Sequence, residues 1–210
     1  MASFLDKLLR RPNYGEPIVI VSGLPRSGTS MMMRMLEAAG LPIMTDAVRT
    51  ADLDNPKGYY EYERVKDLEK EQDKSYIREG RGKVLKVISW LLKDLPDENF
   101  YRIVFMRRDL DEVLASQNKM LVHRGEDNPA DDAVIADAYR SHLATVKIMG
   151  RNKPNWALLE VRYDAAVRDP KAAAAQVNAF LGGKLDEAAM VAAVEQDLYR
   201  NRKGDTVKPG

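Results

Sequence analysis

The sequence predicts a three-layer α/β domain in which helices cover both faces of a parallel sheet. Short, continuous apolar runs rich in β-branched residues recur along the chain, which is typical of strands buried on both faces. Segments with helical periodicity separate these runs, as the crossover connections of a parallel sheet require. The chain has 210 residues, of which 45% are hydrophobic. This length suits one domain, so residues 1–210 are predicted to fold as a single unit.

The first predicted strand and helix are joined by a glycine-containing loop. Residues 17–21 are a continuous apolar run and predict a buried strand. Residues 22–28 follow as a loop with two glycines. Residues 29–39 have helical periodicity, and Gly40 is expected to end that helix. A strand, a glycine loop and a helix in this order are the opening of a P-loop domain.

Further elements alternate in the same way. Three apolar runs predict strands, at residues 84–88, 102–106 and 156–161. Three segments predict helices, one from Asp109 onward, one at residues 130–149, and one that starts at Asp169-Pro170 and ends at Gly182-Gly183. The polar stretch at residues 46–81 has no strand pattern, so it is predicted to be an inserted lid or helix.

The composition excludes several kinds of site. The chain has no cysteine, which excludes disulfides, thiolate metal sites and cysteine nucleophiles. Only His123 and His142 carry an imidazole, so we expect no metal centre. The net charge of +1 gives no indication of nucleic-acid or membrane binding, so any anion site must be local. No apolar run approaches the length of a membrane span, and we expect a cytoplasmic protein.

The glycine loop indicates an anion site of an unusual kind. Residues 23–30 have the glycine spacing of a Walker A loop, but Thr29 stands where that motif has its lysine. In nucleotide triphosphatases the lysine neutralises the β- and γ-phosphates. Its absence indicates a ligand without a γ-phosphate, bound by the backbone N–H groups around Gly28 and the start of the helix. Arg26 supplies a cation from within the loop.

A second anion site is predicted at the end of the strand at residues 102–106. Arg108 follows the carboxyl end of this strand, where open α/β sheets bind their ligands. Ser116 lies two helical turns further on, away from the apolar stripe of its helix. An arginine and a hydroxyl that converge there suit a phosphate, because a guanidinium group makes paired, charge-assisted hydrogen bonds to phosphate.

These motifs resemble those of the sulfotransferases that use 3′-phosphoadenosine 5′-phosphosulfate (PAPS). The loop Pro25-Arg26-Ser27-Gly28-Thr29 is similar to their 5′-phosphosulfate loop, in the version found in tyrosylprotein sulfotransferases. Residues 103–109, with Ser116 eight places after Arg108, resemble their 3′-phosphate motif. The resemblance covers residues 18–204 and implies a sulfotransferase-like fold.

Two later motifs extend the resemblance. Residues 161–164 are similar to the family's late strand, where an aromatic residue commonly contacts adenine, and this implies Tyr163. Arg202-Lys203-Gly204 resembles the basic C-terminal loop that closes over the 3′-phosphate in cytosolic members. The residues that the resemblance and the loop chemistry assign to PAPS are Pro25, Arg26, Ser27, Gly28, Thr29, Ser30, Arg108, Ser116, Tyr163, Arg202, Lys203 and Gly204.

The expected reaction is transfer of the sulfuryl group to a hydroxyl or amine acceptor with release of 3′,5′-ADP. Arg26 is expected to stabilise the bridging oxygen as that atom becomes anionic. Cytosolic relatives often place a catalytic histidine two residues after a strand lysine, but Ile88 follows Lys86 here. Asp46 and Glu61 are the candidate bases, and Lys86 is a candidate contact for the transferring group. The choice of base is left open.

Two other functions stay open at this point. One is a P-loop kinase or nucleotide triphosphatase, which the missing lysine disfavours. The other is a nucleotide-binding protein with a sulfotransferase-like fold and no catalysis, which the missing histidine allows. The expected acceptor is a small molecule, carbohydrate or phenol, and neither its identity nor the oligomeric state can be predicted.

Overall fold

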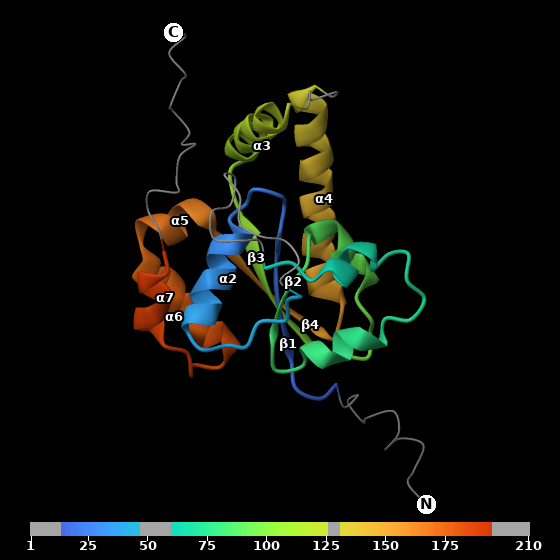
Figure 1. Cartoon of the computed structure of the whole chain (residues 1–210), viewed down its shortest axis with the longest axis vertical. Coiled ribbons are helices and arrows are strands. Elements are labelled where there is room, and N and C mark those ends of the chain that lie inside the picture. Colours follow the sequence, from blue (N-terminus) through green and yellow to red (C-terminus); the bar gives the residue numbers. More distant parts are fainter. Residues whose placement is uncertain (1–13, 47–59, 126–130, 195–210) are drawn as a thin grey trace, which may run out of the picture.

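The structure, a computed structural model, describes residues 14–46, 60–125 and 131–194, and it confirms the α/β class (Figure 1). Four parallel strands form one sheet in the order β2-β1-β3-β4. The strands are β1 (Ile18–Gly23), β2 (Val84–Lys86), β3 (Tyr101–Arg107) and β4 (Trp156–Arg162). Because all four run in one direction, their carboxyl ends and the segments that follow them share one edge of the sheet.

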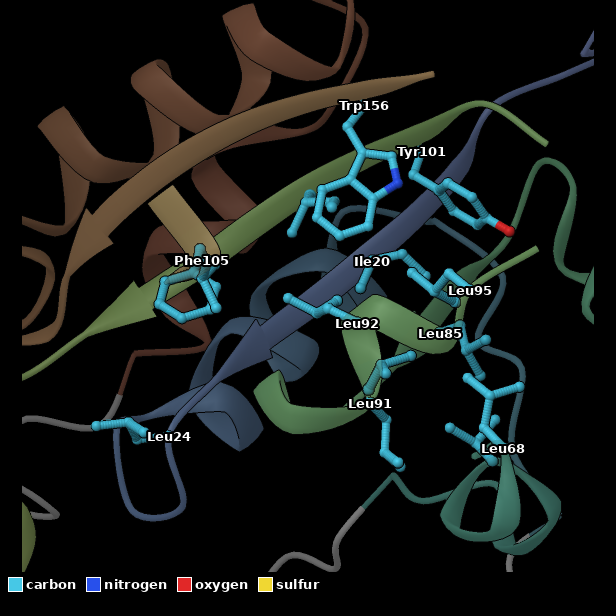
Figure 2. Close-up of a cluster of buried hydrophobic side chains, with 14 of the residues drawn as sticks. Ile20, Leu24, Leu68, Leu85, Leu91, Leu92, Leu95, Tyr101, Phe105 and Trp156 are labelled. Carbon is cyan, nitrogen blue, oxygen red and sulfur yellow. The ribbon is translucent and has the colours of Figure 1, made fainter. Parts of the chain in front are cut away.

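The sheet is buried on both faces, as the apolar runs predict. Along β1, Ile18 and Ile20 belong to one core cluster, whereas Val19 and Val21 belong to the other. Tyr101 and Phe105 of β3 fill the first cluster together with leucines from the connections, as Figure 2 shows. The alternation divides each strand between two cores, which accounts for the three-layer arrangement.

Helices cover each face. On the side of Val19 lie α2 (Thr29–Ala38), α5 (Tyr163–Arg168), α6 (Pro170–Leu181) and α7 (Glu187–Ala192) (Figure 1). On the side of Ile20 lie α3 (Leu110–Arg124), α4 (Asp132–Asn152) and the 3₁₀ helices η1 (Glu63–Asp67), η2 (Ser75–Gly80) and η3 (Ser89–Asp94). No helix in these described ranges is both long and apolar enough to cross a membrane.

Most element boundaries agree with the sequence, with one clear error. The strand predicted at residues 84–88 ends at Lys86. Val87 still donates to the carbonyl of Val21 (3.0 Å), but Ile88 then caps η3 and the chain leaves the sheet. The residues at 60–81 form η1 and η2, whose apolar side chains are buried in the core; a function of this segment as a lid stays a prediction.

A half-buried histidine, His142, connects α4 to η3. The Nε2 atom of His142 lies 2.9 Å from Oγ of Ser89, and the ring of Trp90 stacks on the imidazole with centroids 4.1 Å apart. Burial lowers the pKa of His142 below its ordinary value of 6.5. The neutral imidazole is therefore the form that the fold favours.

This burial predicts a pH-dependent stability. The unfolded chain binds a proton at His142 more tightly than the folded chain, so unfolding takes up a proton between the folded pKa and about 6.5. We expect the free energy of unfolding to fall as the pH drops through this window, and His142→Gln to flatten the slope. Urea denaturation at several pH values measures it. Equal slopes for wild type and His142→Gln would contradict the prediction.

Candidate functional site

The loop between β1 and α2 is tightly folded. Ser27 N donates to the carbonyl of Leu24 (3.2 Å), and Arg26 has a left-handed backbone with a φ of 64°. Gly28, the N-cap of α2, has a φ of 96°. A Cβ atom at Gly28 would collide with the ring of Tyr163, so both the backbone angle and the space require glycine. The loop is thereby brought against the segment that follows β4.

The start of α2 is suited to an anion. The N-cap of this helix, Gly28, has no side chain to cap it, and the first turn contains no acidic residue. By contrast, Asp109, Asp131 and Asp169 accept hydrogen bonds from the first-turn amides of α3, α4 and α6. The N-terminus of a helix carries partial positive charge, so α2 adds to the charge of Arg26 beside it.

The residues of the two predicted anion sites touch each other. Arg26 Nε donates to Ser116 Oγ (3.0 Å), and Arg108 Nη1 donates to the backbone carbonyl of Arg26 (3.1 Å). Ser116 is 4% exposed. The residues assigned to the two predicted anion sites therefore adjoin. The reason is the strand order, because β1 and β3 are neighbours and the segments after them meet at one edge.

The side chain of Arg108 forms a buried ion pair with Glu112 and a cation–π contact with Tyr163. Its Nε lies 3.0 Å from Oε2 of Glu112, and the two side chains are only 7% and 6% exposed. Its guanidinium also lies 4.7 Å from the ring centroid of Tyr163. Burial raises the pKa of the Tyr163 hydroxyl, whereas the positive charges of Arg108, Arg34 and Arg26 oppose that rise. Arg108 thus packs on the tyrosine that the resemblance assigns to adenine, and the charges of Arg34 and Arg26 also act on it.

The other loop residues line the start of α2. Pro25 is exposed, Thr29 and Ser30 are partly exposed, and Ser27 is buried. The Oγ atom of Ser27 has no hydrogen-bond partner within residues 14–46, 60–125 and 131–194. Arg202, Lys203 and Gly204 lie outside the described residues, so their predicted role stays a prediction.

The candidate acceptor-side residues also come together. Lys86 Nζ lies 3.8 Å from Oε1 of Glu61, whose other oxygen is 2.9 Å from Nζ of Lys66. Thr45 Oγ1 donates to the backbone carbonyl of Glu61 (2.9 Å), and Oδ2 of Asp46 accepts from the N–H of Glu63 (2.6 Å). Lys86 pairs with Val21 of β1, so this group lies at the same edge of the sheet as the glycine loop.

Sequence reasoning missed one residue of this region. Arg34 on α2 lies in a run of buried residues, Met31 to Leu36, whose methionines by themselves indicate ordinary core packing. The available signal was a single charged residue within an apolar stretch of the helix.

Comparison with known proteins identifies the family of the chain. The family model described as a sulfotransferase domain matches residues 16–209. The sulfotransferase domain of the Synechococcus PCC 7002 olefin synthase superimposes with a TM-score of 0.55 at 19% identity, over 90% of this chain and 82% of that one, which supports the fold. A sulfotransferase from Alicyclobacillus acidocaldarius gives a TM-score of 0.49 at 17% identity, over 88% of each chain. No curated protein sequence matches the chain. Since the family model covers nearly the whole chain, the chain belongs to the sulfotransferase domain family.

Proposed function

We propose that the chain transfers the sulfuryl group of PAPS to a hydroxyl or amine acceptor and releases 3′,5′-ADP. The observation that carries this proposal is the direct contact of Arg26 with Ser116 and with Arg108. PAPS has a phosphosulfate at its 5′ end and a phosphate at its 3′ end. A ligand with two anionic ends requires cations from more than one element, and adjoining sites suit two groups on one ribose.

The described residues fit such a ligand. The uncapped start of α2 and Arg26 offer donors to the 5′-phosphosulfate. Arg108 and Ser116 offer donors to the 3′-phosphate, and Tyr163 offers an aromatic ring for adenine. Ser116 Oγ accepts a hydrogen bond from Arg26 Nε, and its O–H can in addition donate to a phosphate oxygen. None of these contacts needs a γ-phosphate.

In the proposed reaction, an acceptor oxygen or nitrogen attacks sulfur while the bond from sulfur to the bridging oxygen breaks. The negative charge that develops on the departing nucleotide oxygen is stabilised by Arg26 and by the first amides of α2. The acceptor loses its proton to a carboxylate, for which we propose Glu61. This carboxylate lies 3.8 Å from Nζ of Lys86, a cation suited to the oxygens of the transferring group. Asp46 instead accepts a hydrogen bond from the backbone N–H of Glu63, so we assign a structural role to Asp46.

Nucleotide binding tests the proposal without knowledge of the acceptor. We expect 3′,5′-ADP to raise the thermal unfolding temperature in the absence of magnesium, because the chain offers donors to both phosphates and lacks the Walker lysine. A ligand at about 100 times its dissociation constant adds about 2.7 kcal/mol to the free energy of unfolding. ATP with magnesium should add much less. Equal or greater stabilisation by ATP that depends on magnesium would contradict the proposal and favour a kinase or nucleotide triphosphatase.

A further inference from the structure

Arg34 is a buried cation whose Nε atom lacks a hydrogen-bond acceptor among the residues that the structure describes. The residue lies in the middle of α2 and is 8% exposed, with methionines on either side of it in sequence. Its Nε atom is fully buried and has no hydrogen-bond partner in the part of the chain that the structure describes. A buried guanidinium group without a partner opposes folding, because desolvation of the charge is not compensated. The presence of Arg34 at this position is therefore better explained by a function than by a contribution to stability.

The surroundings of Arg34 connect it to the nucleotide site. Ser30, in the first turn of α2, precedes it by four residues and therefore lies on the same face of the helix. The charge of Arg34 opposes the rise in the pKa of Tyr163, which is the residue in contact with Gly28 and Arg108. Met33 and Met35, which flank Arg34, belong to the same buried cluster as Tyr163, so Arg34 lies on the part of α2 that packs near this tyrosine.

The charge of Arg34 also acts on a second tyrosine, Tyr60. Burial and a hydrogen bond to Glu37 raise the pKa of Tyr60 to about 12, and the charge of Arg34 opposes this rise. The hydroxyl of Tyr60 donates to Oε2 of Glu37 (2.5 Å), so the nearest acid along α2 has a neutral partner. Glu37 itself is exposed, at the outer end of the helix.

The charges around Tyr163 do not balance. Three arginines act on its hydroxyl, namely Arg26, Arg34 and Arg108, against one carboxylate, Glu112. Glu112 pairs with Arg108, and Nε of Arg26 bonds to the neutral hydroxyl of Ser116. Within the described residues, neither Arg26 nor Arg34 forms an ion pair with a carboxylate. Within the described residues, Arg26 and Arg34 therefore both act on Tyr163 without an ion pair of their own, and an excess of positive charge of this kind suits an anionic ligand.

We propose that Arg34 is a further nucleotide-binding residue, and that its guanidinium group contacts the nucleoside end of the donor beside Tyr163. The proposal rests on the proposed function. Arg26 lies in the loop and is assigned to the reacting end, whereas Arg34 lies one turn beyond Ser30 along α2. Arg34 therefore contributes to affinity for the nucleotide and not to stabilisation of the breaking bond.

The test compares Arg34→Met with wild type in two measurements on the full chain. Methionine keeps the length and apolar part of the side chain and removes the charge, and Arg34→Lys keeps the charge. Without ligand, Arg34→Met should unfold at the same temperature as wild type or higher, because an uncompensated buried charge is gone. Its affinity for 3′,5′-ADP, measured by calorimetry, should fall by about tenfold to a hundredfold, and Arg34→Lys should recover part of it. Arg78→Met, at an exposed ion pair of η2, should change neither measurement.

The measurements distinguish failure of the inference on Arg34 from failure of the proposed function. An affinity of Arg34→Met within about twofold of wild type would overturn the inference and leave the proposed function intact. A marked loss of thermal stability without ligand, with affinity unchanged, would identify Arg34 as a structural residue. Failure of wild type itself to bind 3′,5′-ADP would overturn the proposed function, and the inference with it. With an acceptor in hand, Arg34→Met should raise KM for PAPS and leave kcat near the wild-type value.

Discussion

Replacement of Arg26 by alanine is expected to lower the turnover number by about a hundredfold to a thousandfold, while 3′,5′-ADP affinity falls much less. Loss of a single preorganised donor to developing charge has an effect of this size. An interaction that strengthens in the transition state affects kcat, whereas one that is equal in ground and transition state affects binding alone. Single-turnover assays with PAPS and a responsive acceptor measure the rate, and calorimetry measures the affinity.

Two further variants at Arg26 separate charge from backbone strain. Arg26→Lys keeps the charge and should recover part of the turnover. Arg26→Gly removes the side chain but relieves the left-handed backbone at a φ of 64°, so it should lose turnover while gaining stability of about 1 kcal/mol. An Arg26→Ala enzyme with normal kcat and a raised KM for PAPS would show that Arg26 binds the donor only. The role at the breaking bond would then belong to Lys86 or to the loop amides.

Replacement of Arg108 by alanine is expected to have two large effects. It leaves the carboxylate of Glu112 buried without its cation, and loss of one partner of a buried pair destabilises a protein by about 3–5 kcal/mol. It also removes the proposed donor to the 3′-phosphate, so 3′,5′-ADP should lose more affinity than 5′-AMP does. Urea denaturation measures the first effect and calorimetry with both nucleotides measures the second.

The neighbouring arginine provides a matched control. Arg107 is 34% exposed and lies 3.9 Å from Glu160, so Arg107→Ala should change the free energy of unfolding by about 1 kcal/mol or less. The double variant Arg108→Met with Glu112→Leu removes the buried pair as a unit. It should recover stability without recovering affinity for 3′,5′-ADP. If 5′-AMP and 3′,5′-ADP lose affinity equally in this double variant, Arg108 does not recognise the 3′-phosphate.

Three of the four strands were predictable from the sequence because each has six or seven residues, most of them apolar. The runs in β1, β3 and β4 are long enough to give a continuous apolar signal. β2 has only three residues in the sheet, and the apolar residues that follow it serve the core from η3 instead. The helices α5 and α7 have six residues each, too few for a helical period to be visible.

The site residues that directly follow a strand could be predicted from the sequence. Arg26, Arg108 and Tyr163 each follow a strand, and parallel strands bring the segments after them to one edge of the sheet. The hydrogen bond between Arg26 and Ser116 was not predictable, because it depends on β1 lying next to β3, and strand order has no local signal. Arg34 was missed because the methionines around it resemble ordinary core residues.

Sulfuryl transfer itself is the central claim, and an acceptor screen with radiolabelled PAPS tests it most directly. Purified wild-type chain is incubated with PAPS carrying labelled sulfur and a panel of phenols, carbohydrates and amines, with Arg26→Ala as the matched control. The account predicts label in at least one acceptor, formation of 3′,5′-ADP in equal amount, and a rate that Arg26→Ala lowers by about a hundredfold or more. Binding of 3′,5′-ADP with no transfer to any acceptor would contradict the account and indicate a nucleotide-binding protein without catalysis.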